Sequence, residues 1–138
     1  MNISTVRDAI ETRLDTIGIR VYTSIPESVV VPCAIIQYAD GEFMQFDDTF
    51  SLADSVPYSL NMKILVLAGR TALRASQDKL DDFLSVSGND SIRKAITGDT
   101  DMGSNVDSVR VVSAGNFGVY SYSNVDYLGV HFSLEIIG

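Results

Sequence analysis

The clearest pattern in the chain is a strict alternation of apolar and polar side chains near its C-terminus. Over residues 126–136 every second residue is apolar, the set being Leu128, Val130, Phe132, Leu134 and Ile136. Successive side chains of a strand point to opposite faces of a sheet, so this alternation predicts a strand with one buried face. Residues of about 56–68 repeat it with Tyr58, Leu60, Met62, Ile64 and Val66. Two long strands of this kind predict an antiparallel sheet that is covered on one side.

Helical spacing occurs in three other segments. Apolar residues recur every three or four positions from Val6 to Ile17 and Gly18 follows, which predicts a helix over about residues 4–17. The same spacing predicts a second helix over about 71–86 and a short third helix over 91–96. Shorter strands are expected at 19–23, 33–38 and 109–114, a polar loop at 97–108, and a turn at 115–118, where glycine and asparagine gather.

Residues 39–56 mix aromatic and acidic side chains without a sustained period, so we expect an extended excursion or a loosely paired hairpin there. No repeat or low-complexity linker divides the chain, which predicts a single domain over residues 1–138. The expected fold class is α+β: a mainly antiparallel sheet of four to five strands, with two main helices and one short helix packed on one face.

Composition narrows the function classes. The chain has 138 residues, enough for one hydrophobic core, and a net charge of −8, which argues against a surface that wraps nucleic acid. Its start lacks the features of an export signal, and no apolar run approaches the roughly 20 residues of a membrane span, so no membrane association is expected. The single cysteine, Cys33, is expected to be a small buried hydrophobe in a chain made in a reducing compartment.

The sequence gives only weak signals for acid–base or metal chemistry. The motif Asp99-Thr100-Asp101-Met102-Gly103 begins like a calcium loop but lacks the later glycine and glutamate. The acid pairs at 47–48 and 81–82 are adjacent in sequence, so their side chains point in different directions. We therefore expect no metal site, no cofactor and no catalytic carboxylate pair.

His131 is the only histidine and lies on the polar side of the last predicted strand. A nucleophile for it would have to be Ser133, Ser59 or Cys33, brought near by strand pairing. A hydrogen-bonded histidine without catalytic work is the preferred interpretation, and a hydrolase is the alternative.

Aromatic and methionine side chains outside the predicted sheet core are the more unusual feature. Such side chains are enriched at the centres of protein interfaces. They fall in two connecting segments and predict a subunit or partner interface made by Phe43, Met44, Phe46, Phe50, Phe117, Tyr120, Tyr122 and Tyr127. The alternative is that both segments fold back over an edge of the core.

The chain resembles the tail terminator and head-tail joining proteins of long-tailed bacteriophages. The resemblance is carried by the N-terminal helix with Arg7, Ile10 and Leu14, the passage from Leu65 to Arg70, the helix 77–84, the short Ser-x-x-x-Ala-Ile helix at 91–96, and the ending at 109–115 and 127–130. It covers nearly the whole chain in the order of its elements, although each motif is short.

This resemblance implies a structural virion protein without enzymatic activity, located in the neck region of the tail and in the host cytoplasm during assembly. Such proteins form a ring, here expected to be a homo-hexamer, that caps tail-tube polymerisation. The implied partners are the tail tube protein and a head-tail connector or stopper protein, while genome DNA passes through without specific binding. An acidic lumen would suit that passage, because it repels phosphate. Another neck or head-completion protein, or a cellular protein-binding adaptor that uses residues 39–56, is the alternative.

Overall fold

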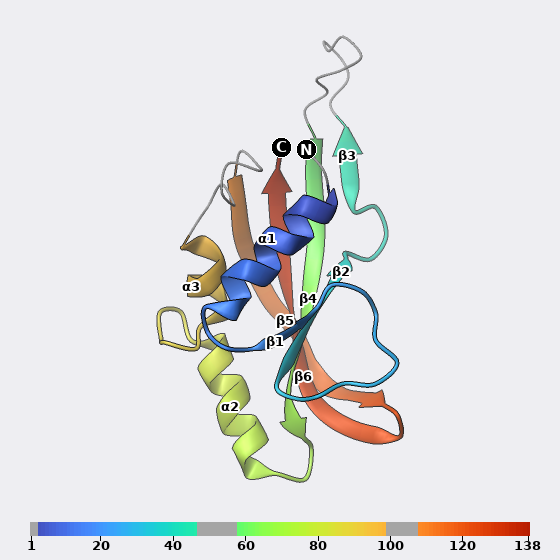
Figure 1. Ribbon diagram of the computed structural model, residues 1–138, viewed down its shortest axis with the longest axis vertical. Coiled ribbons are helices and arrows are strands. Elements are labelled where there is room, and N and C mark those ends of the chain that lie inside the picture. The colour runs from blue at the N-terminus through green and yellow to red at the C-terminus, as the bar shows by residue number, and fades with distance from the viewer. Residues whose placement is uncertain (1–2, 47–57, 99–107) are drawn as a thin grey trace.

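The computed structural model describes residues 3–46, 58–98 and 108–138. These residues form three helices and six strands (Figure 1). Their order along the chain is α1 (Ile3–Asp15), β1 (Arg20–Tyr22), β2 (Cys33–Tyr38), β3 (Met44–Phe46), β4 (Tyr58–Arg70), α2 (Arg74–Leu84), α3 (Ile92–Thr97), β5 (Ser108–Tyr122) and β6 (Val125–Ile137).

One mixed sheet contains all six strands, in the order β1-β2-β4-β6-β5, with β3 paired to the first residues of β4. Every pairing is antiparallel except that of β1 with β2. The α+β class is confirmed, but the predicted four to five strands fall short of the six described. β1 lies within the strand expected at 19–23, and the additional strand is β3, whose three residues are too few for a period-two pattern to show.

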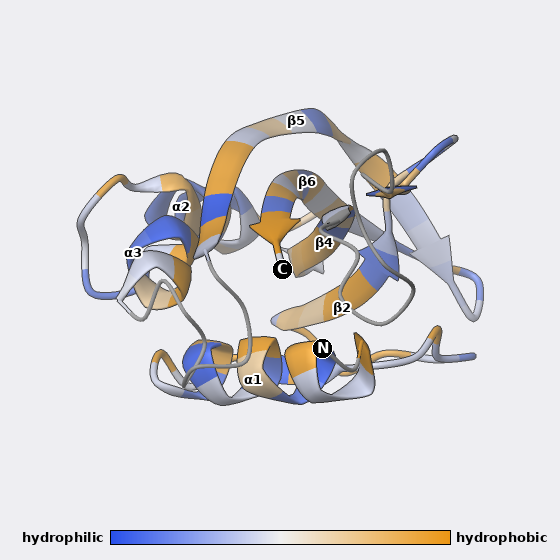
Figure 2. Ribbon diagram, turned by 90° about the horizontal axis from the view of Figure 1, so that it is seen from above, coloured by the Kyte–Doolittle hydropathy of each residue, from blue (hydrophilic) through white to orange (hydrophobic). Residues whose placement is uncertain are grey.

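All three helices cover the same face of the sheet, as predicted. Val6, Ile10 and Leu14 of α1 join one core with Leu80 and Phe83 of α2 and with the buried residues of α3, which are Ile92, Ala95 and Ile96. The sheet curves strongly, so α1 lies against β2 while α3 lies beside β5 (Figure 2), and α2 packs against β4 and β6. Within the described residues, no helix combines the length and apolar character needed to cross a membrane.

The opposite face of the sheet is not uniformly polar, so the prediction of a one-sided sheet was wrong at one end. Leu65 and Leu67 of β4 form a second buried cluster there with Cys33, Ile35 and Tyr127. Residues from the segment 22–31 and from the end of the β5–β6 hairpin pack over this cluster. Cys33 is buried as predicted, and desolvation raises the pKa of its thiol to about 11.

Residues 115–118 do not form the predicted turn. They lie inside β5, where the register against β6 shifts between Gly115 and Gly118 and Asn116 adopts a positive φ of 55°. This geometry is a bulge, which asparagine and glycine accommodate as readily as a turn. The chain reverses instead at Ser123 and Asn124, both with positive φ, as a tight two-residue hairpin requires.

A candidate subunit interface

The excursion after β2 is anchored by two of its apolar side chains and leaves a third exposed. Phe43 stacks on Tyr38 with ring centroids 4.4 Å apart, and Phe43 and Met44 both pack against the main core. Phe46, at the end of β3, is 63% exposed. The described part of the excursion is therefore held to the sheet and ends in one exposed aromatic ring, while Phe50 and the acid pair 47–48 lie outside the described residues.

β5 presents a second exposed apolar patch along the other edge of the sheet. Val112, Phe117 and Val119 are each more than half exposed, and Phe117 lies within the bulge. Within the described part of the chain, β5 pairs only with β6, so its outer edge has no strand beside it. Bulges of this kind hinder direct strand pairing at an edge, which leaves side-chain contact as the natural use of this surface.

The three predicted interface tyrosines pack against their own chain. Tyr127 is 8% exposed within the second cluster, and Tyr120 and Tyr122 pack partly buried beside it. The Tyr120 hydroxyl donates a 2.6 Å hydrogen bond to the carbonyl of Asn116 and so braces the bulge. Of the predicted residues that are described, Phe46 and Phe117 are the ones whose rings stand free on the subunit surface.

His131 belongs to a small polar cluster on the second face of the sheet. Its Nδ1 lies 3.4 Å from Nδ2 of Asn116, which among described residues is its one hydrogen-bond partner, and its ring lies 5.4 Å from that of Tyr120. Partial burial lowers the pKa of the imidazole, and Lys63 adds to that effect while Asp40 opposes it. Lys63 itself forms a 2.9 Å ion pair with Asp40.

The other residues considered for metal or acid–base chemistry are the calcium-like motif and the acid pair on α2. The calcium-like motif 99–103 lies outside the described residues. Asp81 and Asp82 are both exposed on α2, and Asp81 accepts a 3.0 Å hydrogen bond from Gln77. Across residues 3–46, 58–98 and 108–138, no group of three or more histidine, cysteine or acidic side chains is arranged to hold a metal ion.

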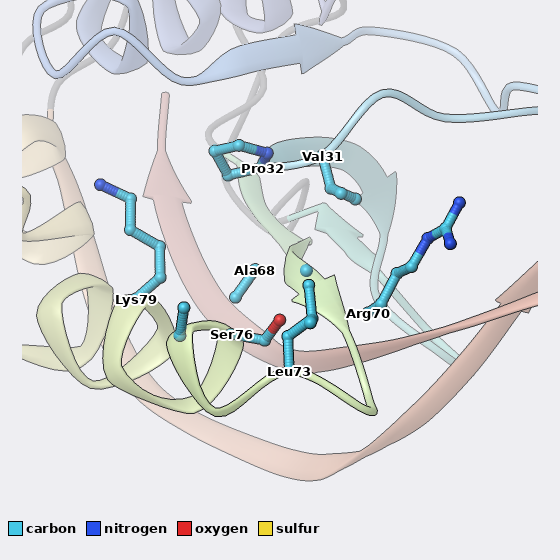
Figure 3. A pocket seen from close by; sticks show the side chains of 9 residues that line it. Val31, Pro32, Ala68, Arg70, Leu73, Ser76 and Lys79 are labelled. Atoms are coloured by element: carbon cyan, nitrogen blue, oxygen red, sulfur yellow. The ribbon is translucent and has the colours of Figure 1, made fainter.

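A pocket of about 420 Å³, which no pattern in the sequence predicts, opens between the start of α2, the residues just before β2 and the end of β4 (Figure 3). Leu73 and Ser76 point from α2 toward Ala68, and Val31 and Pro32 form the opposite wall. The lining is completed by Gly69, Arg70, Ala75 and Lys79. α2 approaches β4 closely because residue 69 is a glycine, since a Cβ there would collide with the Ser76 hydroxyl. We call this cavity the α2 pocket.

The α2 pocket is apolar at its centre and positively charged at its margins. Arg70 and Lys79 flank it from two sides, and Arg70 has no ion-pair partner among the described residues. Lys79 pairs with Asp90 at 3.2 Å, which offsets much of its charge. Among the residues that the structure describes, no side chain caps the N-terminus of α2, and no acid lies in its first turn. The positive end of the helix dipole therefore adds to the charge of Arg70.

The sequence did not predict the α2 pocket, because its lining comes from three separate segments whose residues form no recognisable motif. Two weak signals could have pointed to it. The first is Leu73, which precedes Arg74 where a Ser, Thr, Asp or Asn cap is usual. The second is a run of three cations, Arg70, Arg74 and Lys79, within ten residues of a chain whose net charge is −8.

Comparison of the chain with protein-family models and with curated proteins gives no match.

Proposed function

We propose that this protein is a structural component of a phage virion, a tail terminator or head-tail joining protein that forms a ring at the head-proximal end of the tail. The observation that carries the proposal is the placement of its exposed aromatic rings. Phe46 on β3 and Phe117 on β5 stand at opposite edges of one sheet, with β4 and β6 between them. A subunit with two separated apolar sites can contact two different neighbours.

Ring closure needs such an arrangement. In a head-to-tail contact each subunit uses two different patches, and the contacts close into a ring when the rotation between neighbours divides a full turn. A third surface must remain for the tail tube or the connector. The exposed end of β3, the β5 patch and the α2 pocket supply three separate surfaces on one small subunit.

The charge of the chain supports the same role. A net charge of −8 gives little attraction for the phosphate backbone, so DNA could pass the ring without being held. The resemblance adds the expected partners: six copies of the chain, the tail tube protein and a connector or stopper protein. It also implies that the assembled ring belongs to the virion neck.

The test is the assembly state of the purified chain, alone and mixed with tail tubes, measured by native mass spectrometry and negative-stain imaging. We expect a closed ring, or ring caps on tube ends. Replacing Phe117 by Asp should lower the assembled fraction about tenfold or more, because a buried charge at an interface centre removes an anchor. Val86→Asp is the matched control, since Val86 is similarly exposed but lies in the loop between α2 and α3 and not on β5.

A chain that stays monomeric at high concentration and ignores tail tubes would contradict the proposal and favour the adaptor role. Equal assembly by the wild type and Phe117→Asp would show that the β5 patch is not part of the assembly interface. Turnover of an ester or peptide substrate that His131→Ala abolishes would instead support the hydrolase.

A further inference from the structure

We propose that a second pocket, which opens where the parallel strands β1 and β2 separate, is a binding site for a carboxylate that Arg7 of α1 holds. The inference does not depend on the proposed ring, and it concerns a part of the molecule that the candidate interface does not use. The carboxylate belongs either to a free small acid or to an acidic side chain of another protein, and binding measurements separate these two sources.

The pocket, which we call the β1–β2 pocket, has a volume of about 430 Å³ and lies at the C-terminal ends of the two strands. β1 pairs with β2 only over residues 33–35, so residues 36–38 have no strand on that side within the described part of the chain. Residues 23–25, which follow β1, also line the pocket, and α1 contributes Arg7. The volume is in the range of small-molecule sites, and the C-terminal ends of parallel strands are a common place for one.

Arg7 is a cation whose donors are not all satisfied by its own chain. Its guanidinium carbon lies 4.7 Å from the centroid of the Tyr38 ring, which is itself stacked on Phe43. The Nε atom of Arg7 is buried without a hydrogen-bond partner among the described residues, and Arg7 forms no ion pair with them. A ring face attracts the positive charge but does not replace an oxygen acceptor. A carboxylate offers two oxygens in one plane, which match the planar fork of a guanidinium.

The charges in the lining favour a ligand with one negative charge. The lining contains two cations, Arg7 and Lys63, and one acid, Asp40, so its net charge is +1. Lys63 and Asp40 form a 2.9 Å ion pair, and the hydrogen bond from Lys63 lowers the pKa of Asp40 and keeps it ionised. This pair largely neutralises itself, which leaves Arg7 as the available cation. A single carboxylate balances that charge, whereas a phosphate group carries nearly two negative charges at neutral pH.

The rest of the lining suits a small organic body attached to the carboxylate. Two of these residues are apolar, Ile25 and Ile36, and three are polar and uncharged, Thr23, Ser24 and Gln37. Ligand sites typically combine apolar walls with a few polar groups that fix the orientation of the ligand. The β1–β2 pocket has this composition, with Arg7 as its charged anchor.

Tryptophan fluorescence can report binding, because the chain contains no tryptophan. Tyr38→Trp keeps an aromatic ring beside Arg7 and places the single emitter in the lining of the pocket. At constant ionic strength, we expect sodium acetate to change the emission with half-saturation at roughly 1–10 mM, which suits so small a ligand. Phe117→Trp, in the exposed bulge of β5, is the matched reporter that should not respond. The melting temperature of the wild type should rise over the same range of acetate concentration.

Substitutions in the Tyr38→Trp chain test the role of each charge. Arg7→Gln should weaken acetate binding about tenfold or more, and Arg7→Lys, which keeps the charge but not the planar fork, should lose less. Arg20→Gln removes an exposed arginine of β1 that does not line the pocket, so it should change the affinity by about twofold or less. Asp40→Asn removes the opposing charge and should tighten binding about two- to fivefold, a gain that a misfolded variant could not give.

A peptide identifies the source of the carboxylate. If acetyl-Gly-Glu-Gly-amide binds at least about tenfold more tightly than acetate, the site is assigned to an acidic protein side chain. Equal or weaker binding of the peptide assigns the site to a free small acid. The same peptide with glutamine in place of glutamate should not bind in either case.

Three results would overturn the carboxylate site. The first is a response of the same size to sodium chloride or phosphate, which would show an adventitious ion only. The second is the absence of saturation up to about 100 mM acetate in both the reporter chain and the wild type. The third is equal binding by Arg7→Gln and the parent chain. None of these measurements requires assembly, so the carboxylate site and the proposed ring stand or fall separately.

Discussion

The two faces of the sheet are built differently, and β4 shows both designs along one strand. Toward the helices its residues Leu60, Met62, Ile64 and Val66 are all buried. Toward the other side its residues change midway from Asn61 and Lys63 to the buried Leu65 and Leu67. Alternation therefore marks the stretch with one covered face, and the unbroken apolar run 64–68 marks the stretch that is covered on both.

The largest loss of stability should follow a cavity-creating substitution in the core between the helices and the sheet. Phe83 is 1% exposed and fills the space between α2 and the sheet. Phe83→Ala should lower the free energy of unfolding by about 3–5 kcal/mol, measured by urea denaturation, because it leaves a cavity that close packing cannot fill. Leu84→Ala, one residue further on the exposed side of α2, should cost far less. Similar losses for both would show that α2 does not bury the face described.

The second cluster should respond more weakly, and Gly129 is the sharpest probe of it. A Cβ at Gly129 would lie 2.7 Å from the Leu67 side chain, 2.9 Å from Tyr120 and 3.0 Å from the backbone oxygen of Val66. Gly129→Ala should therefore cost about 1–3 kcal/mol, since the neighbours must move. Gly115→Ala is the matched control in the adjoining strand, because a Cβ there meets nothing within 4 Å. A neutral Gly129→Ala would mean that the cluster is loosely packed.

The smallest effect concerns the polar half of the second face and depends on pH. The pKa of His131 is lowered from its usual 6.5 by partial burial, so the unfolded chain binds the proton more tightly than the folded one. The contribution of neutral His131 to the free energy of unfolding is fully present above about pH 6.5. It is lost as the pH falls through the pKa that the imidazole has in the folded chain. Unfolding free energies measured between about pH 7.5 and 5 should decrease slightly toward acid. His131→Gln should flatten that slope, and an unchanged slope would assign it to other groups.

The parts of the fold that were predictable are those with a long period. α1 and α2 carry three or four turns of apolar spacing, and β6 alternates from Val130 to Ile136, so the existence of these elements and their helix-side buried faces follow from local sequence. Two of the helix ends shift by two or three residues: α1 ends at Asp15, and α2 begins at Arg74, because Leu73 is extended. The three-residue strand β3 depends on its pairing with β4, and no local pattern identifies it.

The candidate interface was predictable only in part, for a related reason. Aromatic character identified Phe46 and Phe117, but it could not separate them from Tyr127, which lies 8% exposed among Cys33, Ile35 and Leu67. That distinction depends on how the β5–β6 hairpin curls over the second face. The α2 pocket could not be predicted from the sequence, because Val31, Ala68 and Leu73 come together only after the sheet and α2 have formed.

The position of β6 has a consequence for when the subunit becomes usable. This strand pairs with β4 on one side and β5 on the other, so it occupies the interior of the sheet although residues 125–137 are synthesised after every other element. Until they leave the ribosome, β4 lacks its longest partner and the apolar residues that β6 contributes are missing. Interrupted translation products would thus lack a finished sheet, and only polypeptides translated through Ile137 could compete for a place in an assembly.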